Sequence, residues 1–111
     1  MNLKIEIKTD NYNSPNIFFE TLSCVETNSL GCMRKTQADF IFYYFLKTKE
    51  LYILRAKPLN AWFDKNIDKF SKKSFRNKRF NGVDLYTSEG YTIPKKILEK
   101  DFKHYQKLIL N

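Results

Sequence analysis

One stretch of sequence decides the fold, Phe40-Ile41-Phe42-Tyr43-Tyr44-Phe45-Leu46-Lys47-Thr48-Lys49-Glu50-Leu51-Tyr52-Ile53-Leu54-Arg55. Its two ends are rich in β-branched and aromatic residues, which favour strands, and the polar connection at 47–50 is short. We therefore expect an antiparallel β-hairpin made of strands 40–46 and 51–55.

Two further strands are expected on the N-terminal side of this hairpin. Leu3, Ile5 and Ile7 alternate with charged residues, a period of two that predicts a half-buried strand running to about Thr9. Turn-forming residues fill 10–16, and the apolar run 17–25 predicts a second strand. Because the connection is a turn, we expect these two strands to lie side by side.

The C-terminal half predicts helices and short strands. Pro58 begins a helix with an apolar stripe at Leu59, Trp62, Phe63, Ile67 and Phe70. Pro94 begins a second helix with Ile97, Leu98, Phe102, Tyr105, Leu108 and Ile109 on one side. Short strands are expected at 83–86 and 91–93, and Thr36 is expected to cap a helical turn through residues 37–39. The fold class is α/β (α+β in looser terms), with a mixed four- or five-stranded sheet and two main helices.

Length and charge limit the classes of protein that fit. The 111 residues make one domain, 1–111, and 20 Lys and Arg against 12 Asp and Glu give a net charge of +8. Such a charge favours a polyanionic partner, with nucleic acid first and an acidic protein second.

No run reaches the roughly 18 apolar residues of a membrane span, and the N-terminus does not resemble a signal peptide. We expect a cytoplasmic protein with no membrane partner, in which Cys24 and Cys32 are reduced thiols and Cys24 is buried.

The positive charge is concentrated between residues 65 and 80, which hold seven Lys or Arg and one Asp. Such a run is often a solvated helix face or a loop. The aromatic side chains within it favour nucleic acid, since Phe75 can stack on an unpaired base, whereas Phe70 and Phe80 fit the core equally well. The predicted phosphate contacts are Lys72, Lys73, Arg76, Lys78 and Arg79.

Two acids form the strongest chemical pattern. Asp10 ends the first expected strand, and Glu20 lies within the apolar second strand, where an unpaired carboxylate is costly. Side by side, they make the hard-oxygen site that Mg²⁺ or Mn²⁺ prefers, and such an ion activates water at a phosphodiester. The alternatives are a turn-capping role for Asp10 and a solvent-facing or ion-paired position for Glu20. Asp39 and His104 are expected to have structural roles.

These residues resemble a known family. The acids at Asp10 and Glu20, the segment 36–45 that includes Thr36-Gln37-Ala38-Asp39, and the segment 87–94 near the end are similar to small phage-encoded proteins of the PD-(D/E)XK, or restriction-endonuclease-like, superfamily. The resemblance covers roughly residues 8 to 97. It implies a reduced restriction-endonuclease-like core and Mg²⁺- or Mn²⁺-dependent nuclease activity on DNA, or a nuclease-derived DNA-binding protein of a phage or other mobile element, acting in the host cytoplasm.

The chain departs from the family pattern at the lysine two positions after the acid, where it has Leu22. That lysine would stabilise the charge of the transition state. Lys35 or Gln37 are the candidate substitutes. The missing lysine also favours a non-enzymatic basic interaction protein, such as a phage inhibitor of a host defence nuclease with a host or phage protein as partner. A second rival is an oligomerisation module, such as a homodimer, that pairs through exposed strands.

Overall fold

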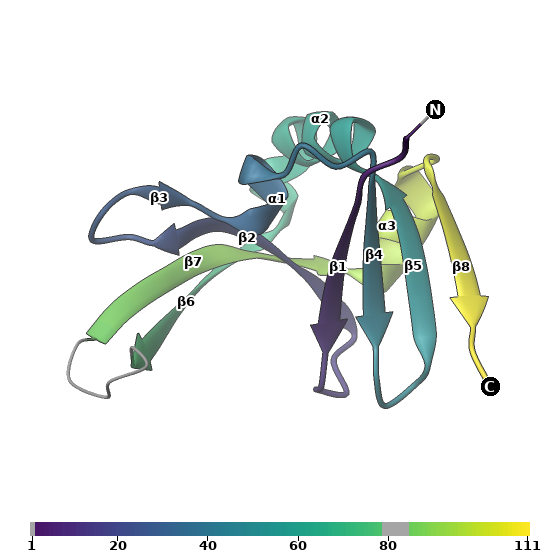
Figure 1. Ribbon diagram of the computed structural model, residues 1–111, viewed down its shortest axis with the longest axis horizontal. Coiled ribbons are helices and arrows are strands. Elements are labelled where there is room, and N and C mark those ends of the chain that lie inside the picture. Colours follow the sequence, from purple (N-terminus) through teal and green to yellow (C-terminus); the bar gives the residue numbers. More distant parts are fainter. Residues whose placement is uncertain (1, 79–84) are drawn as a thin grey trace.

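The computed structural model describes residues 2–78 and 85–111 and shows an α+β protein built on two four-stranded sheets (Figure 1). The mixed sheet contains, in spatial order, β1 (Ile5–Asp10), β4 (Phe40–Phe45), β5 (Glu50–Arg55) and β8 (Tyr105–Ile109). The antiparallel sheet contains β3 (Ser29–Leu30), β2 (Asn16–Cys24), β7 (Leu85–Pro94) and β6 (Ser71–Lys78). The helices are α1 (Cys32–Lys35), α2 (Ala56–Asn66), the 3₁₀ turn η1 (Ile67–Lys69) and α3 (Lys95–Asp101).

The predicted fold class is confirmed, and the hairpin at its centre forms as expected. β4 and β5 pair antiparallel, with Tyr43 opposite Tyr52. The expected pairing of the first two strands is wrong, because β1 pairs in parallel with β4 whereas β2 pairs with β3 and β7. The turn after β1 therefore carries the chain from one sheet to the other.

The side of β1 that faces the rest of the protein is the charged side, whereas the apolar side was expected to be buried. Its register places Ile5 beside Phe40 and Ile7 beside Phe42, on the outer face of the mixed sheet. Ile5 is 46% exposed and Ile7 is 71% exposed. The alternate residues of β1 are half-buried on the inner side, and they are Glu6, Lys8 and Asp10. The charged side of this strand thus faces the rest of the protein.

Aromatic packing on α2 joins the two sheets. Leu59 and Phe63, four residues apart on the buried face of α2, are fully buried. The ring of Phe63 stacks on Phe19 of β2, with 3.9 Å between centroids and nearly parallel planes. The Arg34 guanidinium covers both rings and forms an ion pair with Asp64 at 2.6 Å. In Figure 1, α2 lies above the junction of the sheets, and α3 lies behind the mixed sheet.

The two short strands expected at 83–86 and 91–93 are a single strand, β7, over its described residues 85–94. Residues 87–90 do not form a turn, because β2 and β6 pair with β7 on both sides. Gly90 fits here for lack of a side chain, since a Cβ would lie 2.5 Å from the Phe19 carbonyl oxygen. Opposite Gly90 and Glu89, Thr21 is the extra residue of a β-bulge in β2. The start of the first expected strand at Val83 and the turn at residues 81–82 lie outside the described residues.

The expected C-terminal helix is half as long as its periodicity suggested. It ends at Asp101, and residues 105–109 form β8, which pairs with the free edge of β5. The spacing of Tyr105, Leu108 and Ile109 continues the helical stripe, and the sequence Tyr-Gln-Lys-Leu-Ile has no alternation of apolar and polar residues that would predict a strand. The backbone hydrogen bonds of the β5 edge favour the strand.

Two smaller expectations also change. The helical turn lies before Thr36, at Cys32–Lys35, because the Thr36 hydroxyl accepts a hydrogen bond from the Ala38 N–H and turns the chain instead of capping a helix. Most of the described basic segment is the strand β6, with Lys72, Lys73, Arg76 and Lys78, whereas Lys65 lies at the end of α2 and Lys69 in η1. Cys24 and Cys32 are free thiols and are half-buried, not buried. Within the described residues, no helix has the length and apolar character needed to cross a membrane.

A network of charged side chains connects β5, β8 and α3 at the start of β5. Glu50, at the start of β5, accepts hydrogen bonds from Lys95 of α3 at 2.7 Å and from Thr48 at 2.7 Å. Lys107 of β8 lies 3.0 Å from both Glu50 and Glu99. Burial raises the pKa of the Glu50 carboxyl, but the hydrogen bonds from Lys95, Thr48 and Lys107 outweigh it and lower the pKa to about 2. The ionised form of Glu50 is therefore favoured by folding.

Replacing Glu50 with Gln should lower the free energy of unfolding at neutral pH by about 1–2 kcal/mol, because the folded protein stabilises the carboxylate. This contribution is complete above the ordinary pKa of about 4.5 and is lost as the pH falls toward 2. Urea unfolding of both proteins across this range should show their difference shrinking on acidification. Asp68→Asn, which removes an exposed carboxylate, is the control, and a pH-independent difference would contradict the network's role.

Candidate functional site

The inner side of β1 faces the antiparallel sheet, and two hollows lie between them. We call the first the acid–lysine pocket; Glu6, Glu20, Cys32 and Lys35 are among its lining residues. We call the second the aromatic groove, and its lining includes Asp10, Tyr12, Phe18, Phe75, Asn77 and Ser88. Both hollows therefore collect residues from strands that are distant in the sequence.

Lys8 of β1 lines the aromatic groove and also contacts Cys32, which lines the acid–lysine pocket. Its Nζ is 5.8 Å from the centroid of the Phe18 ring and donates a hydrogen bond to the Cys32 Sγ at 3.7 Å. Burial raises the pKa of the Cys32 thiol, and the carboxylates of Glu20 and Glu6 raise it further, against the lowering effect of Lys8. The Cys32 thiol is thus protonated at neutral pH.

Asp10 has two partners at the end of β1. One carboxylate oxygen accepts a hydrogen bond from the Tyr12 N–H at 2.7 Å, which is the turn-capping role that the sequence left open. The other accepts from the Tyr43 hydroxyl at 3.4 Å. That hydroxyl in turn accepts from the Phe18 N–H at 3.0 Å. Burial, followed by the nearby Asp10 charge, raises the pKa of Tyr43, so its hydroxyl remains a donor.

Glu20 lies in the other hollow. Its side chain is half-buried, and its Oε1 accepts a hydrogen bond from the Cys32 N–H at 3.4 Å, at the first residue of α1. Asp10 and Glu20 lie on strands of different sheets, and each lines its own hollow. The acid that shares a pocket with Glu20 is Glu6. The alternation along β1 did not indicate this, because it placed the charged side of the strand toward solvent.

The two candidate substitutes for the missing lysine are separated by the structure. Lys35, in the last turn of α1, lines the acid–lysine pocket with Glu20. Gln37 lines a different hollow, beside Arg55 and Asn60. Of the two, Lys35 is the residue that the fold brings to the acids.

The donor set of the acid–lysine pocket suits a hard divalent cation. Glu6 and Glu20 offer carboxylate oxygens, the ligand type that Mg²⁺ and Mn²⁺ prefer. Over residues 2–78 and 85–111, no three His, Cys, Asp or Glu side chains form a metal-binding group. The binding of Mg²⁺ or Mn²⁺ by this chain stays a prediction.

The predicted phosphate-contact residues divide into two groups on β6. The first group is ion-paired: Lys72 pairs with Glu89 at 2.6 Å, and Arg76 pairs with Glu26 at 2.7 Å. Lys73 and Lys78 make no ion pair with the part of the chain that the structure describes, and both are exposed. Arg79 lies outside the described residues.

Glu26 is held firmly by β7. Its carboxylate accepts hydrogen bonds from the Thr87 N–H at 2.8 Å, from the Thr87 hydroxyl at 2.9 Å and from Arg76. The bond from the Thr87 N–H is the strongest of the effects that lower the pKa of Glu26 to about 2. Glu26 and Glu89 thus neutralise part of the basic strand, and nothing in their sequence spacing indicated it.

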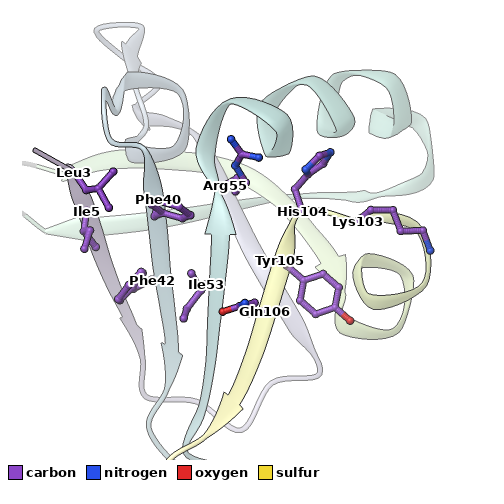
Figure 2. A pocket seen from close by; sticks show the side chains of 10 residues that line it. All are labelled: Leu3, Ile5, Phe40, Phe42, Ile53, Arg55, Lys103, His104, Tyr105 and Gln106. Atoms are coloured by element: carbon purple, nitrogen blue, oxygen red, sulfur yellow. The ribbon is translucent and has the colours of Figure 1, made fainter. Parts of the chain in front are cut away.

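The outer face of the mixed sheet is a third feature. Figure 2 shows Ile5, Phe40, Phe42 and Ile53 side by side on this face, with His104 at its upper end. In the part of the chain that the structure describes, no helix lies in front of this face in Figure 1. His104 lies apart from both hollows, and its carbonyl accepts a hydrogen bond from the Arg55 N–H, which agrees with a structural role.

Comparison with known proteins gives no family for this chain: no family model, no curated protein and no solved structure matches it. The resemblance to PD-(D/E)XK nucleases stays a prediction from the sequence.

Replacing Tyr43 with Phe should lower the free energy of unfolding by roughly 1–3 kcal/mol, because the Phe18 N–H loses its partner in a half-buried position. Tyr44→Phe is a matched control, since Tyr44 lies one residue away with its side chain half-buried on the outer face, and it should change stability by less than about 0.5 kcal/mol. Chemical denaturation measures both. Equal effects of the two variants would show that the hydroxyl does not connect the sheets.

Proposed function

We propose that this protein binds nucleic acid through the edge strand β6 and the cleft beside it. The observation that carries the proposal is the position of β6, an exposed edge strand with Lys73 and Lys78 open to solvent. Lys73 and Lys78 are five residues apart and so project from opposite faces of β6, which places one ammonium on each side of the edge that a phosphate backbone would follow. The net charge of +8 adds long-range attraction for a polyanion.

The ion pairs on β6 refine which residues contact phosphate. Arg76 is engaged by Glu26 and Thr87, and Lys72 by Glu89, so each would give up existing partners to bind a phosphate. Lys73 and Lys78 would give up none within the described residues. We therefore assign the main phosphate contacts to Lys73 and Lys78.

Removing Lys73 and Lys78 together by Ala substitution should weaken nucleic-acid binding at every sequence. If each residue neutralises one phosphate of duplex DNA, the slope of log affinity against log salt should fall by about 0.9 per residue. Fluorescence anisotropy across a salt series measures the slope. Lys96→Ala with Lys100→Ala, on the exposed side of α3, removes the same charge. Equal losses in both double variants would mean that only net charge matters.

We further propose metal-dependent phosphodiester cleavage as the chemistry of the acid–lysine pocket. Glu6 and Glu20 would hold Mg²⁺ or Mn²⁺, which supplies an activated water and neutralises developing charge. The Lys35 ammonium lines the same pocket and is suited to stabilise negative charge on the phosphoryl oxygens. This assignment replaces Asp10 with Glu6 as the partner of Glu20 and keeps Lys35 in the role of the missing lysine.

Mn²⁺ should raise the melting temperature of the wild type but not that of Glu20→Gln or Glu6→Gln, since an ion that binds only the folded state stabilises it. Asp10→Asn should keep the shift, because Asp10 lines the other hollow. A shift lost in Asp10→Asn and kept in Glu6→Gln would restore the pair predicted from the sequence.

Cleavage of linear, circular and single-stranded DNA in Mn²⁺ is the companion assay, with Lys35→Ala expected to lose cleavage but keep binding. Cleavage that survives Glu20→Gln would not come from this pocket. If the wild type binds DNA but cleaves no substrate, the protein is a nucleic-acid-binding protein without nuclease activity.

A non-enzymatic protein-binding role is the second candidate, and the outer face of the mixed sheet favours it. Ile7, Leu108 and Leu3 there are 71%, 46% and 59% exposed, and apolar surfaces of this kind often mark contact sites for other proteins. If the wild type binds no nucleic acid at low salt, this candidate, which includes inhibitors of host nucleases, becomes the better account.

A further inference from the structure

We propose that the aromatic groove holds an unpaired nucleobase, so that the protein prefers single-stranded to duplex nucleic acid. The inference rests on the proposed nucleic-acid binding and adds the form of the ligand. It starts from Phe75, which lies on the basic strand and is 50% exposed.

The aromatic side chains that line the groove include Phe75, Phe18 and Tyr12. Phe75 lies opposite Ser88 of β7, and its ring meets the ring of Phe18 edge to face, with centroids 5.4 Å apart. Tyr12, in the loop after β1, lines the same groove and is 78% exposed. A base that enters between them would cover apolar ring surface that is now in water, which is the basis of sequence-tolerant stacking.

Polar groups in the groove suit the edge of a base. The Asn77 side-chain amide donates to the Phe75 carbonyl at 3.0 Å and to the Ser88 hydroxyl at 3.1 Å. Asn77 lines the groove, and its Oδ1 accepts no hydrogen bond from the described residues, so this acceptor is available to a ligand. Base edges carry both donors and acceptors, and an Asn side chain is able to pair with them.

The charges indicate where the phosphate lies. The groove contains one lysine, Lys8, and one carboxylate, Asp10, so its charges balance and do not favour a phosphate inside. Lys73 lies two residues from Phe75 on the same face of β6, opposite Gly90. A base in the groove would therefore place its phosphate outside, toward Lys73. Bases paired and stacked in a duplex cannot enter such a groove without being unpaired.

The test compares the binding of a fluorescein-labelled oligothymidylate with that of a duplex of equal length, at the same salt concentration. Phe75→Ala should weaken oligothymidylate binding roughly 5- to 100-fold and duplex binding less than about 2-fold, because only the single strand stacks. Phe75→Tyr should retain binding, since it keeps the ring. Ile7→Ala, on the outer face, is the control and should leave both affinities unchanged.

Tyr12→Ala is a second variant for the same comparison, and it should also weaken oligothymidylate binding more than duplex binding. Because Tyr12 is an exposed loop residue, this variant keeps the test valid even if Phe75→Ala fails to fold. Equal effects on both ligands, or none in either variant, would overturn the groove assignment while leaving nucleic-acid binding in place. A wild type that binds neither ligand would instead overturn the proposed function itself.

Discussion

The Tyr43 hydroxyl is the polar link on which the arrangement of the two sheets depends. It accepts a hydrogen bond from the Phe18 backbone and donates one to Asp10, so strands of both sheets meet at one buried side chain. Because burial raises the pKa of Tyr43, this hydroxyl keeps its proton at neutral pH and can donate to Asp10 while it accepts from the Phe18 N–H. The cleft between β1 and β2 owes its shape to this contact and to the Phe19–Phe63 stack above it.

The inward charges of β1 explain why this cleft, and not a core, lies beside the strand. Burying the charged side chains of Glu6, Lys8 and Asp10 away from water would be costly. The space that they face therefore stays open to solvent in two hollows. One hollow suits metal-assisted chemistry, and the other suits a stacked base. Both border the antiparallel sheet whose edge strand, β6, is the basic one, so binding and chemistry would occur in one continuous region of the molecule.

The sequence predicted what depends on long, unambiguous patterns. The hairpin at 40–55 formed as expected, because its two apolar runs are rich in strand-forming residues and joined by a short polar connection. The helix expected from Pro58 also formed, but α2 begins at Ala56 and ends at Asn66, so Ile67 and Phe70 of the expected stripe lie beyond it. The helical period failed at the C-terminus, where Tyr105, Leu108 and Ile109 continue the stripe of α3. These residues form β8 because they pair with the free edge of β5, and local periodicity does not reveal that edge. Likewise, alternation along β1 could not tell which side was inward, so Glu6 was overlooked as a partner for Glu20. The pairing of β1 with β4 determines which side of β1 faces inward, and this pairing is a tertiary contact that the local sequence does not encode.

Backbone amide NMR shifts on titration with an oligothymidylate test the central claim, that the cleft between β1 and the antiparallel sheet is the nucleic-acid site. The account predicts that the largest shifts lie at Phe18, Phe75 and Asn77, with smaller ones along β6. It also predicts that Phe42 and Ile53, on the outer face of the mixed sheet, stay unperturbed. Shifts concentrated on that outer face, with β6 unchanged, would contradict the account.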